Sequence, residues 1–183
     1  RTLLSRGQKG CYIYAEDNKN LKIFRHSEFT DEDLIRYARY IEMAMKIAIN
    51  AKYQRPSVCN AIENILVDEA IASVFLPRLY DEFTKLNIQM RGCEKTTKII
   101  SCSTATNDDF YTEYNDYIVA IKVVKNIEEA INHINDHSSK HSEAIVTNDI
   151  NACEKFLNEI DSACVYHNAS TRFTDGGEFG FGA

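Results

Sequence analysis

The second half of the chain alternates short β-branched segments with amphipathic helical ones, and this alternation constrains the fold more than any other feature. The expected strands and helices are, in order, Ile118–Val124, Ile127–His137, Ala144–Thr147, Asp149–Ile160 and Ala163–His167. Asn126 stands where it can cap the first of these helices. Strands and helices in this order are typical of a parallel sheet covered by helices. The sequence therefore predicts an α/β fold with a largely parallel sheet.

The first half predicts further elements of the same kinds. Apolar residues at helical spacing indicate a long helix from Asp31 to about Ala51, opened by a capping box that begins at Thr30. Asp68 is placed to cap another helix, Glu69–Lys85. The remaining expectations are strands at Cys11–Ala15, Ile65–Val67 and Ile88–Arg91, a polar excursion at Glu94–Tyr117 and a loop-like tail at Asn168–Ala183.

The composition limits the classes of function. Of the 183 residues, 44% are hydrophobic and 26% are charged, which is typical of a globular domain. The net charge is −6 and there is no basic tract, so the chain is a poor candidate for binding nucleic acid or an anionic membrane. No apolar run reaches the ~18 residues of a membrane span, and the first residues lack the apolar core of a signal peptide. We therefore expect a cytoplasmic domain with neither kind of partner.

Cys59 stands apart from the other five cysteines, which we expect to pack as small hydrophobic residues. It follows Pro56, which ends the long helix, and it is expected to open a short helical turn over Cys59–Glu63. Unpaired N–H groups at a helix start stabilise a thiolate, and Arg55 adds positive charge. The same groups could hold an oxyanion formed when the sulfur attacks a carbonyl. Cys59 is thus the candidate nucleophile, the alternative being a cysteine that only packs a turn.

Three histidines, His133, His137 and His141, recur at every fourth residue, the spacing at which helix residues share a face. On one continuous helix they could bind a metal ion. Ser138 and Ser139 interrupt the helical pattern, so we expect His141 in the turn that follows the helix. We favour a solvated helix end and expect no metal site, with a metal-binding domain as the alternative.

Three ordered stretches resemble one enzyme family. They are QRPSVCNA at Gln54–Ala61, AINHIN and HSEAIVT at Ala130–Asn135 and His141–Thr147, and DSACVYHNASTRFTDG followed by EFGFGA within Asp161–Ala183. Together they are similar to the γ-glutamyl phosphate reductases, or glutamate-5-semialdehyde dehydrogenases, of the aldehyde dehydrogenase superfamily. The resemblance covers essentially residues 11–183 and implies an aldehyde-dehydrogenase-like catalytic domain.

The resemblance also implies a reaction. The Cys59 thiolate would displace phosphate from L-glutamyl 5-phosphate and form a thioester, which hydride from NADPH would reduce to L-glutamate 5-semialdehyde in proline biosynthesis. The chain would then be part of an NADP-dependent oxidoreductase that requires no metal and is a homo-oligomer at full length. The alternative is a non-catalytic binding or assembly module that retains the shape of the domain.

The resemblance further implies the other site residues. Glu113 lies before an expected strand, where superfamily members have a Glu that contacts the nicotinamide ribose; a solvated loop carboxylate is the alternative. Asn168, Ser170, Thr171 and Arg172 lie in a stretch that the family places near the active site, and they are the expected substrate-binding residues. Arg172 could pair with the carboxylate of the substrate in a bidentate way, or hold its own loop in place.

Members of the family have a cofactor-binding domain before this region and an oligomer-forming tail after it. By this comparison, residues 1–10 are expected to be a remnant of the cofactor-binding domain or a lead-in from it. Residues 11–183 are expected to be the catalytic domain without the oligomerisation tail, and residues 20 to about 39 look like an insertion. Because the NADPH-binding domain would be missing, we expect the isolated chain to have little or no turnover.

Overall fold

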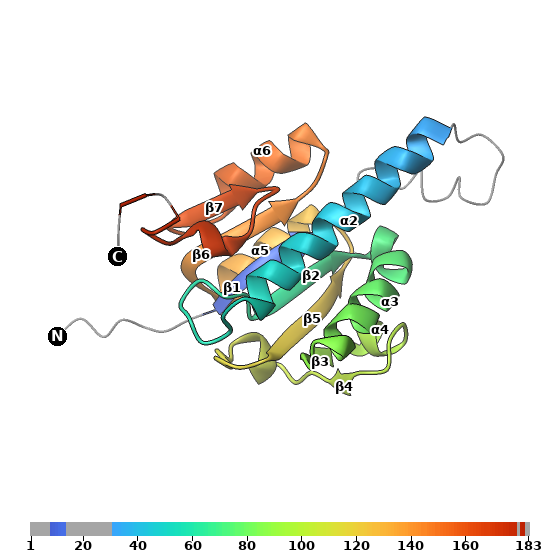
Figure 1. The fold of residues 1–183 in the computed structure, drawn as a ribbon, viewed down its shortest axis with the longest axis horizontal. Coiled ribbons are helices and arrows are strands. Elements are labelled where there is room, and N and C mark those ends of the chain that lie inside the picture. The colour runs from blue at the N-terminus through green and yellow to red at the C-terminus, as the bar shows by residue number, and fades with distance from the viewer. Residues whose placement is uncertain (1–7, 14–30, 179, 182–183) are drawn as a thin grey trace.

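A computed structural model describes residues 8–13, 31–178 and 180–181, and helices lie on both faces of its central sheet (Figure 1). The strands are β1 (Gln8–Ile13), β2 (Asn64–Asp68), β3 (Gln89–Gly92), β4 (Ser103–Thr104), β5 (Ile118–Val124), β6 (Ser138–Val146) and β7 (Cys164–His167). The helices are α2 (Asp31–Tyr53), α3 (Glu69–Lys85), α4 (Glu94–Thr97), α5 (Ile127–His137) and α6 (Ile150–Glu159), with 3₁₀ turns η1 (Asp108–Phe110) and η2 (Thr171–Phe173).

The described strands form one sheet in the order β4-β3-β5-β2-β1-β6-β7, and every neighbouring pair is parallel. β2 is the central strand, and β1 lies next to it, where Cys11 is opposite Ile65 of β2 on one side and Ala144 of β6 on the other. Parallel strands of this kind are normally buried on both faces. The predicted α/β fold with helices flanking a parallel sheet is confirmed.

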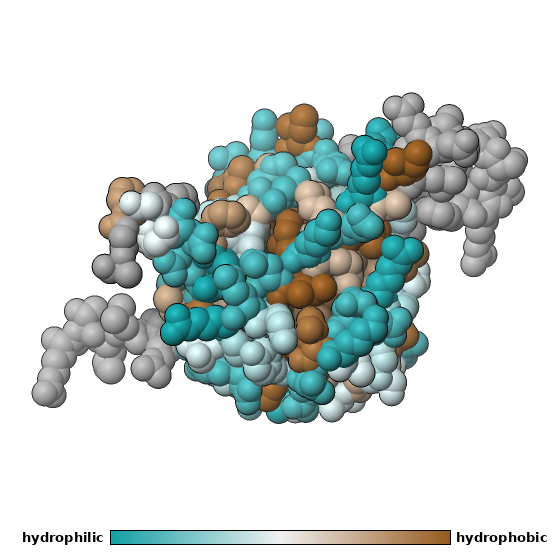
Figure 2. Space-filling view, viewed as in Figure 1, coloured by the Kyte–Doolittle hydropathy of each residue, from teal (hydrophilic) through white to brown (hydrophobic). Residues whose placement is uncertain are grey.

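Two apolar layers hold the helices against the sheet. Ile65 and Val67 pack in the layer that includes α2 and α3, whereas Leu66 between them packs with α5 and α6. Phe75 of α3 and Phe156 of α6 are fully buried, one in each layer. Hydrophilic side chains cover much of the face that carries α2, and apolar residues show beside that helix (Figure 2). Among the described residues, no helix is long and apolar enough to cross a membrane.

Side-chain caps define where three of the helices start. The carboxylate of Asp68 accepts a hydrogen bond of 2.8 Å from the backbone N–H of Ala70, as predicted for the start of α3. Asn126 caps α5 as predicted, and Asp149 caps α6 rather than forming its first turn. The helix α2 begins at Asp31 as expected and continues to Tyr53. The capping box predicted at Thr30 lies outside the described residues.

Two local predictions are wrong. Residues 54–63 form turns, and Cys59–Glu63 is not helical, because the N–H of Ile62 bonds back to the carbonyl of Ala51 at the end of α2. β6 starts at Ser138, immediately after α5, so His141 lies in a strand rather than in a turn. Pairing with β1 and β7 extends this strand beyond the predicted segment.

The remaining expected segments lie as follows. The excursion between β3 and β5 is mostly irregular, as predicted, with only α4, β4 and η1 inside it. Of the segment expected to be an insertion, residues 20–30 lie outside the described ranges and residues 31–39 belong to α2. Of the expected remnant at 1–10, only residues 8–10 are described, and they begin β1.

Candidate active site

Cys59 lies at the surface, on the turn that joins α2 to β2. It is the exposed one of the six cysteines, all of which fall within the described residues; Cys11 and Cys153 are buried. A hydrogen bond of 3.1 Å from the N–H of Ala61 to the carbonyl of Val58 closes the turn around the thiol. The expected helix dipole at Cys59 is therefore absent, but the thiol is accessible to a ligand.

The C-terminal segment that begins at Asn168, called the tail below, is hydrogen-bonded to this turn. The side chain of Asn60 donates to the carbonyl oxygens of Arg172 and Thr174, at 3.2 and 2.9 Å. The hydroxyl of Thr171 donates to the carbonyl oxygen of Asn60 at 2.7 Å. The structure thus brings together two motifs that lie more than 100 residues apart in the sequence.

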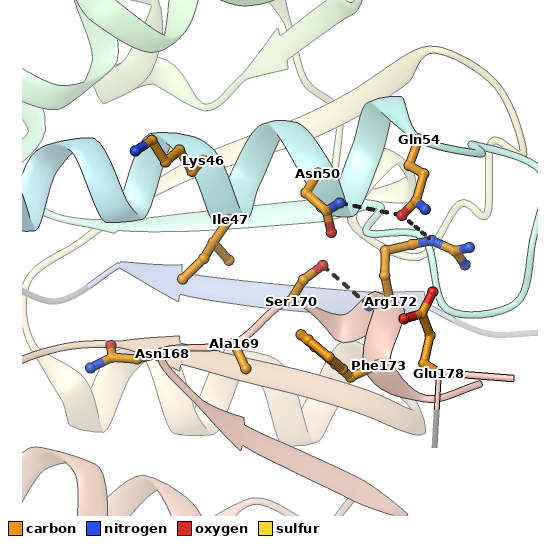
Figure 3. Close-up of a pocket in the computed structure, with 10 residues that line it drawn as sticks. All are labelled: Lys46, Ile47, Asn50, Gln54, Asn168, Ala169, Ser170, Arg172, Phe173 and Glu178. Atoms are coloured by element: carbon orange, nitrogen blue, oxygen red, sulfur yellow. Dashed lines mark hydrogen bonds between the residues drawn. The ribbon is translucent and has the colours of Figure 1, made fainter. Parts of the chain in front are cut away.

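A pocket of about 500 Å³ lies between α2 and this tail (Figure 3). It is lined by Lys46, Ile47, Asn50, Gln54, Asn168, Ala169, Ser170, Arg172, Phe173 and Glu178. The lining therefore combines two cationic side chains, one carboxylate and several amide and hydroxyl groups. Such a mixture suits a small polar ligand that carries charges of both signs.

Arg172 is held in this pocket with spare hydrogen-bonding capacity. Its side chain is 9% exposed, and its Nε donates to Oε1 of Gln54 at 3.2 Å. Its Nη1 is buried and has no hydrogen-bond partner among the described residues. A buried donor without a partner is costly, so an anionic ligand that paired with Arg172 would remove that cost.

Asn168, Ser170 and Thr171 have different placements. Asn168 and Ser170 line the pocket, but the amide of Asn168 also bonds to both the backbone N–H and the carbonyl of Thr147, at 2.9 Å each. Ser170 caps η2 by accepting from the backbone N–H of Arg172. Thr171 is fully buried against Asn60 and does not line the pocket.

Glu113 lies in a segment that contacts Glu63, at the end of the Cys59 turn. It is half-buried, two residues before Asn115, whose N–H donates to Oε1 of Glu63 at 3.3 Å. Glu63 also pairs with Lys52 at 2.8 Å in a fully buried salt bridge. The turn is therefore contacted by the Glu113 segment at Glu63 and by the tail at Asn60.

Lys46 and Asn50 were not singled out from the sequence, and Gln54 was quoted only as the first residue of a family motif, although their four-residue spacing is visible there. Lys46 and Asn50, four residues apart, share one face of α2, and Gln54 directly follows the helix, with its N–H bonded to the carbonyl of Asn50. Lys52 was also missed, because a single lysine near the end of a helix gives no sign of being buried.

The three histidines do not form a metal site. His133 and His137 stack on α5 with ring centroids 3.9 Å apart, whereas His141 lies on β6 and bonds to Ser142. His133 is only 6% exposed, so the expected solvated helix end is wrong for this residue. Burial, followed by the charge of Lys122, lowers the pKa of His133 to about 3. Within the described ranges, no group of three potential ligands could hold a metal ion.

Comparison with known proteins gives consistent matches. Residues 113–182 match the model of the aldehyde dehydrogenase family. A γ-glutamyl phosphate reductase of Nautilia profundicola is 47% identical over 99% of this chain and 44% of its own length. One of Dictyoglomus thermophilum is 61% identical over 78% of this chain and 34% of its own length.

Solved structures show the same relationship. The crystal structure of γ-glutamyl phosphate reductase from Thermotoga maritima has a TM-score of 0.79 at 47% identity, over 98% of this chain and 39% of that one. A lactaldehyde dehydrogenase, only 13% identical over 90% of this chain and 39% of that one, has a TM-score of 0.60 and shows the shared fold alone. The chain spans at most about 44% of the length of these relatives. It has the aldehyde dehydrogenase fold and is a relative of the γ-glutamyl phosphate reductases, as the sequence motifs indicate.

Proposed function

We propose that the chain is the catalytic portion of an NADPH-dependent reductase that converts L-glutamyl 5-phosphate to L-glutamate 5-semialdehyde and phosphate in proline biosynthesis. The observation that carries the proposal is the union of two motifs: the exposed Cys59 lies on a turn that is bonded to the segment bearing Arg172. The names of its relatives support the same activity.

The chemistry assigned to Cys59 is a displacement. Its thiolate attacks the acyl carbon of the substrate, the carbon–sulfur bond forms, and the bond to the phosphate oxygen breaks to release phosphate. A bound nicotinamide would supply the hydride needed to reduce the thioester, and Cys59 would then be released as the thiolate. Among the residues of this chain we assign Glu113 to the cofactor, because its half-buried carboxylate, in the segment that contacts Glu63, can accept hydrogen bonds from ribose hydroxyls.

The pocket between α2 and the tail would hold the amino-acid end of the substrate. Arg172, with its buried Nη1 free of partners among the described residues, suits the carboxylate. Glu178 lines the same pocket and supplies a negative charge for the ammonium group. Asn168 and Ser170 add polar groups to the lining, whereas Thr171 contributes by holding the tail.

The test measures the first half-reaction, which does not require the nicotinamide. The chain is incubated with glutamyl phosphate generated in place from glutamate and ATP by a γ-glutamyl kinase. We expect an acyl adduct on Cys59 by peptide mass spectrometry, with stoichiometric phosphate release. The adduct should be lost in Cys59→Ser. It should be kept in the control Cys93→Ser, in which the same substitution removes a half-buried thiol elsewhere.

Arg172→Gln separates binding from chemistry in the same assay. We expect it to raise the substrate concentration needed for half-maximal acylation by more than tenfold, the effect of losing one charge-assisted pair. Alkylation of Cys59 by iodoacetamide, a neutral reagent, should stay unchanged. A folded chain whose Cys59 is never acylated would contradict the proposal and favour a non-catalytic binding or assembly module.

A further inference from the structure

Asn60 directly follows Cys59, and hydrogen bonds hold both its side chain and its backbone. Its side chain is 2% exposed, and its Nδ2 donates to two carbonyl oxygens of the tail, those of Arg172 at 3.2 Å and Thr174 at 2.9 Å. Its Oδ1 is buried and has no hydrogen-bond partner in the described part of the chain. Among the described residues, the side chain of Asn60 therefore acts only as a hydrogen-bond donor.

The backbone of Asn60 is fixed by the same segment. The hydroxyl of Thr171, which is fully buried, donates to the Asn60 carbonyl oxygen at 2.7 Å. The contact is reciprocal: the turn donates to the tail through a side chain, and the tail donates to the turn through a hydroxyl. The bonds from Asn60 to the Arg172 carbonyl and from Thr171 to Asn60 are buried, whereas the bond to the Thr174 carbonyl is half-buried.

The tail itself is anchored to the sheet. The hydroxyl of Thr174 bonds to the hydroxyls of Ser142 in β6, at 2.7 Å, and Tyr166 in β7, at 2.9 Å. Asn60 binds the carbonyl of the same threonine. Asn60 and Thr174 therefore connect the Cys59 turn, by hydrogen bonds, to two strands of the sheet.

We propose that Asn60 is a positioning residue that sets where the Cys59 thiol lies relative to the Arg172 side chain. The inference rests on the proposed function, because it assigns a role within that site. An amide is suited to the task, since one NH₂ group donates to two carbonyl oxygens at once. A carboxylate of the same shape has no hydrogen to donate and would be repelled by both oxygens.

The test follows the alkylation of Cys59 by iodoacetamide from pH 6 to pH 10, by peptide mass spectrometry, in the 183-residue chain. Asn60→Asp removes the two donated bonds, and Thr171→Val removes the hydroxyl while keeping the shape of the side chain. We expect each variant to change the rate at Cys59 by about threefold or more, or to move the midpoint of its pH profile. The double variant should do no more than the stronger single one, because both act on Cys59 through the position of Asn60.

Two controls separate positioning from general loosening. Asn64→Ala removes a buried amide, 6% exposed, that donates to the carbonyl of Phe110; it should leave Cys59 unchanged. The rate at Cys93, measured in the same samples, should also stay constant. Circular dichroism checks that each variant is folded.

The outcome that would overturn the proposal is a folded Thr171→Val whose Cys59 rate and pH profile match those of the unmodified chain. Thr171→Val also keeps the test decisive where Asn60→Asp fails to fold. Failure of the proposed function has a different signature: Cys59 would respond to Thr171→Val in alkylation, yet take no acyl group from glutamyl phosphate.

Discussion

The buried salt bridge between Lys52 and Glu63 gives the sharpest prediction about stability. It joins the last turn of α2 to the residue before β2, at 2.8 Å, with the side chains 0% and 1% exposed. Lys52→Met keeps the apolar stem and removes the ammonium from a carboxylate that water does not reach. Breaking one half of such a pair costs about 3–5 kcal/mol. This is a large share of the ~5–15 kcal/mol that typically separates folded from unfolded states.

The assay is urea unfolding followed by circular dichroism, with the free energy of unfolding compared at an unchanged m-value. The control is Lys85→Met, which removes an exposed pair with Glu82 and should cost less than about 1 kcal/mol. The double variant Lys52→Met/Glu63→Gln removes both charges but keeps an acceptor for Asn115, so it should recover much of the loss.

Two results would refute this reasoning. A loss in Lys52→Met no larger than that in Lys85→Met would show that burial does not make the pair special. A double variant as unstable as the single one would show that the loss comes from packing rather than from a charge left in the interior.

Three further predictions concern the core, the buried histidine and a crowded glycine. Phe75→Ala should lower the free energy of unfolding by about 3–5 kcal/mol in the same urea assay, while Phe181→Ala, at an 86% exposed position, should leave it unchanged; equal losses would contradict the assigned core. The pKa of His133 is lowered to about 3 in the folded chain, so below about pH 6.5 this histidine binds a proton in the unfolded chain but not in the folded one. Stability should therefore fall by up to about 2 kcal/mol more between pH 7 and pH 5 than in His133→Gln, and parallel pH profiles would exclude this effect. Gly92→Ala should cost about 1–3 kcal/mol, because the added methyl would lie 2.6 Å from Cγ2 of Thr96; a variant with an unchanged urea midpoint would show that the site relaxes freely.

The sequence predicts the elements that depend on neighbouring residues. The β-branched run in β5, the caps at Asp68 and Asn126 and the apolar spacing of α2 all act within a few residues, and each of these predictions is confirmed. The α/β class follows from their order along the chain. These local signals are mutually consistent, as expected for a chain with one preferred fold.

What the sequence could not predict depends on distant contacts. The turn at Cys59 is not helical because Ile62 bonds to α2 and Asn60 to the tail. His133 is buried because Phe110, from the irregular excursion, packs edge-on against its ring at 5.3 Å. The family motifs indicated which segments meet, while the pocket and its lining from α2 emerged only from the packing.

The bond between Asn60 and Thr171 also has a consequence for the order in which the molecule is assembled. Its two ends are 111 residues apart, so during synthesis the cysteine-bearing turn emerges long before the segment that will hold it. Bringing such distant segments together is slow compared with forming local contacts. Every strand that the structure describes precedes Asn168 in the chain, so these strands can pair while the site is still open. Among the described residues, the contact that holds the Cys59 turn therefore depends on a segment made after every strand of the sheet.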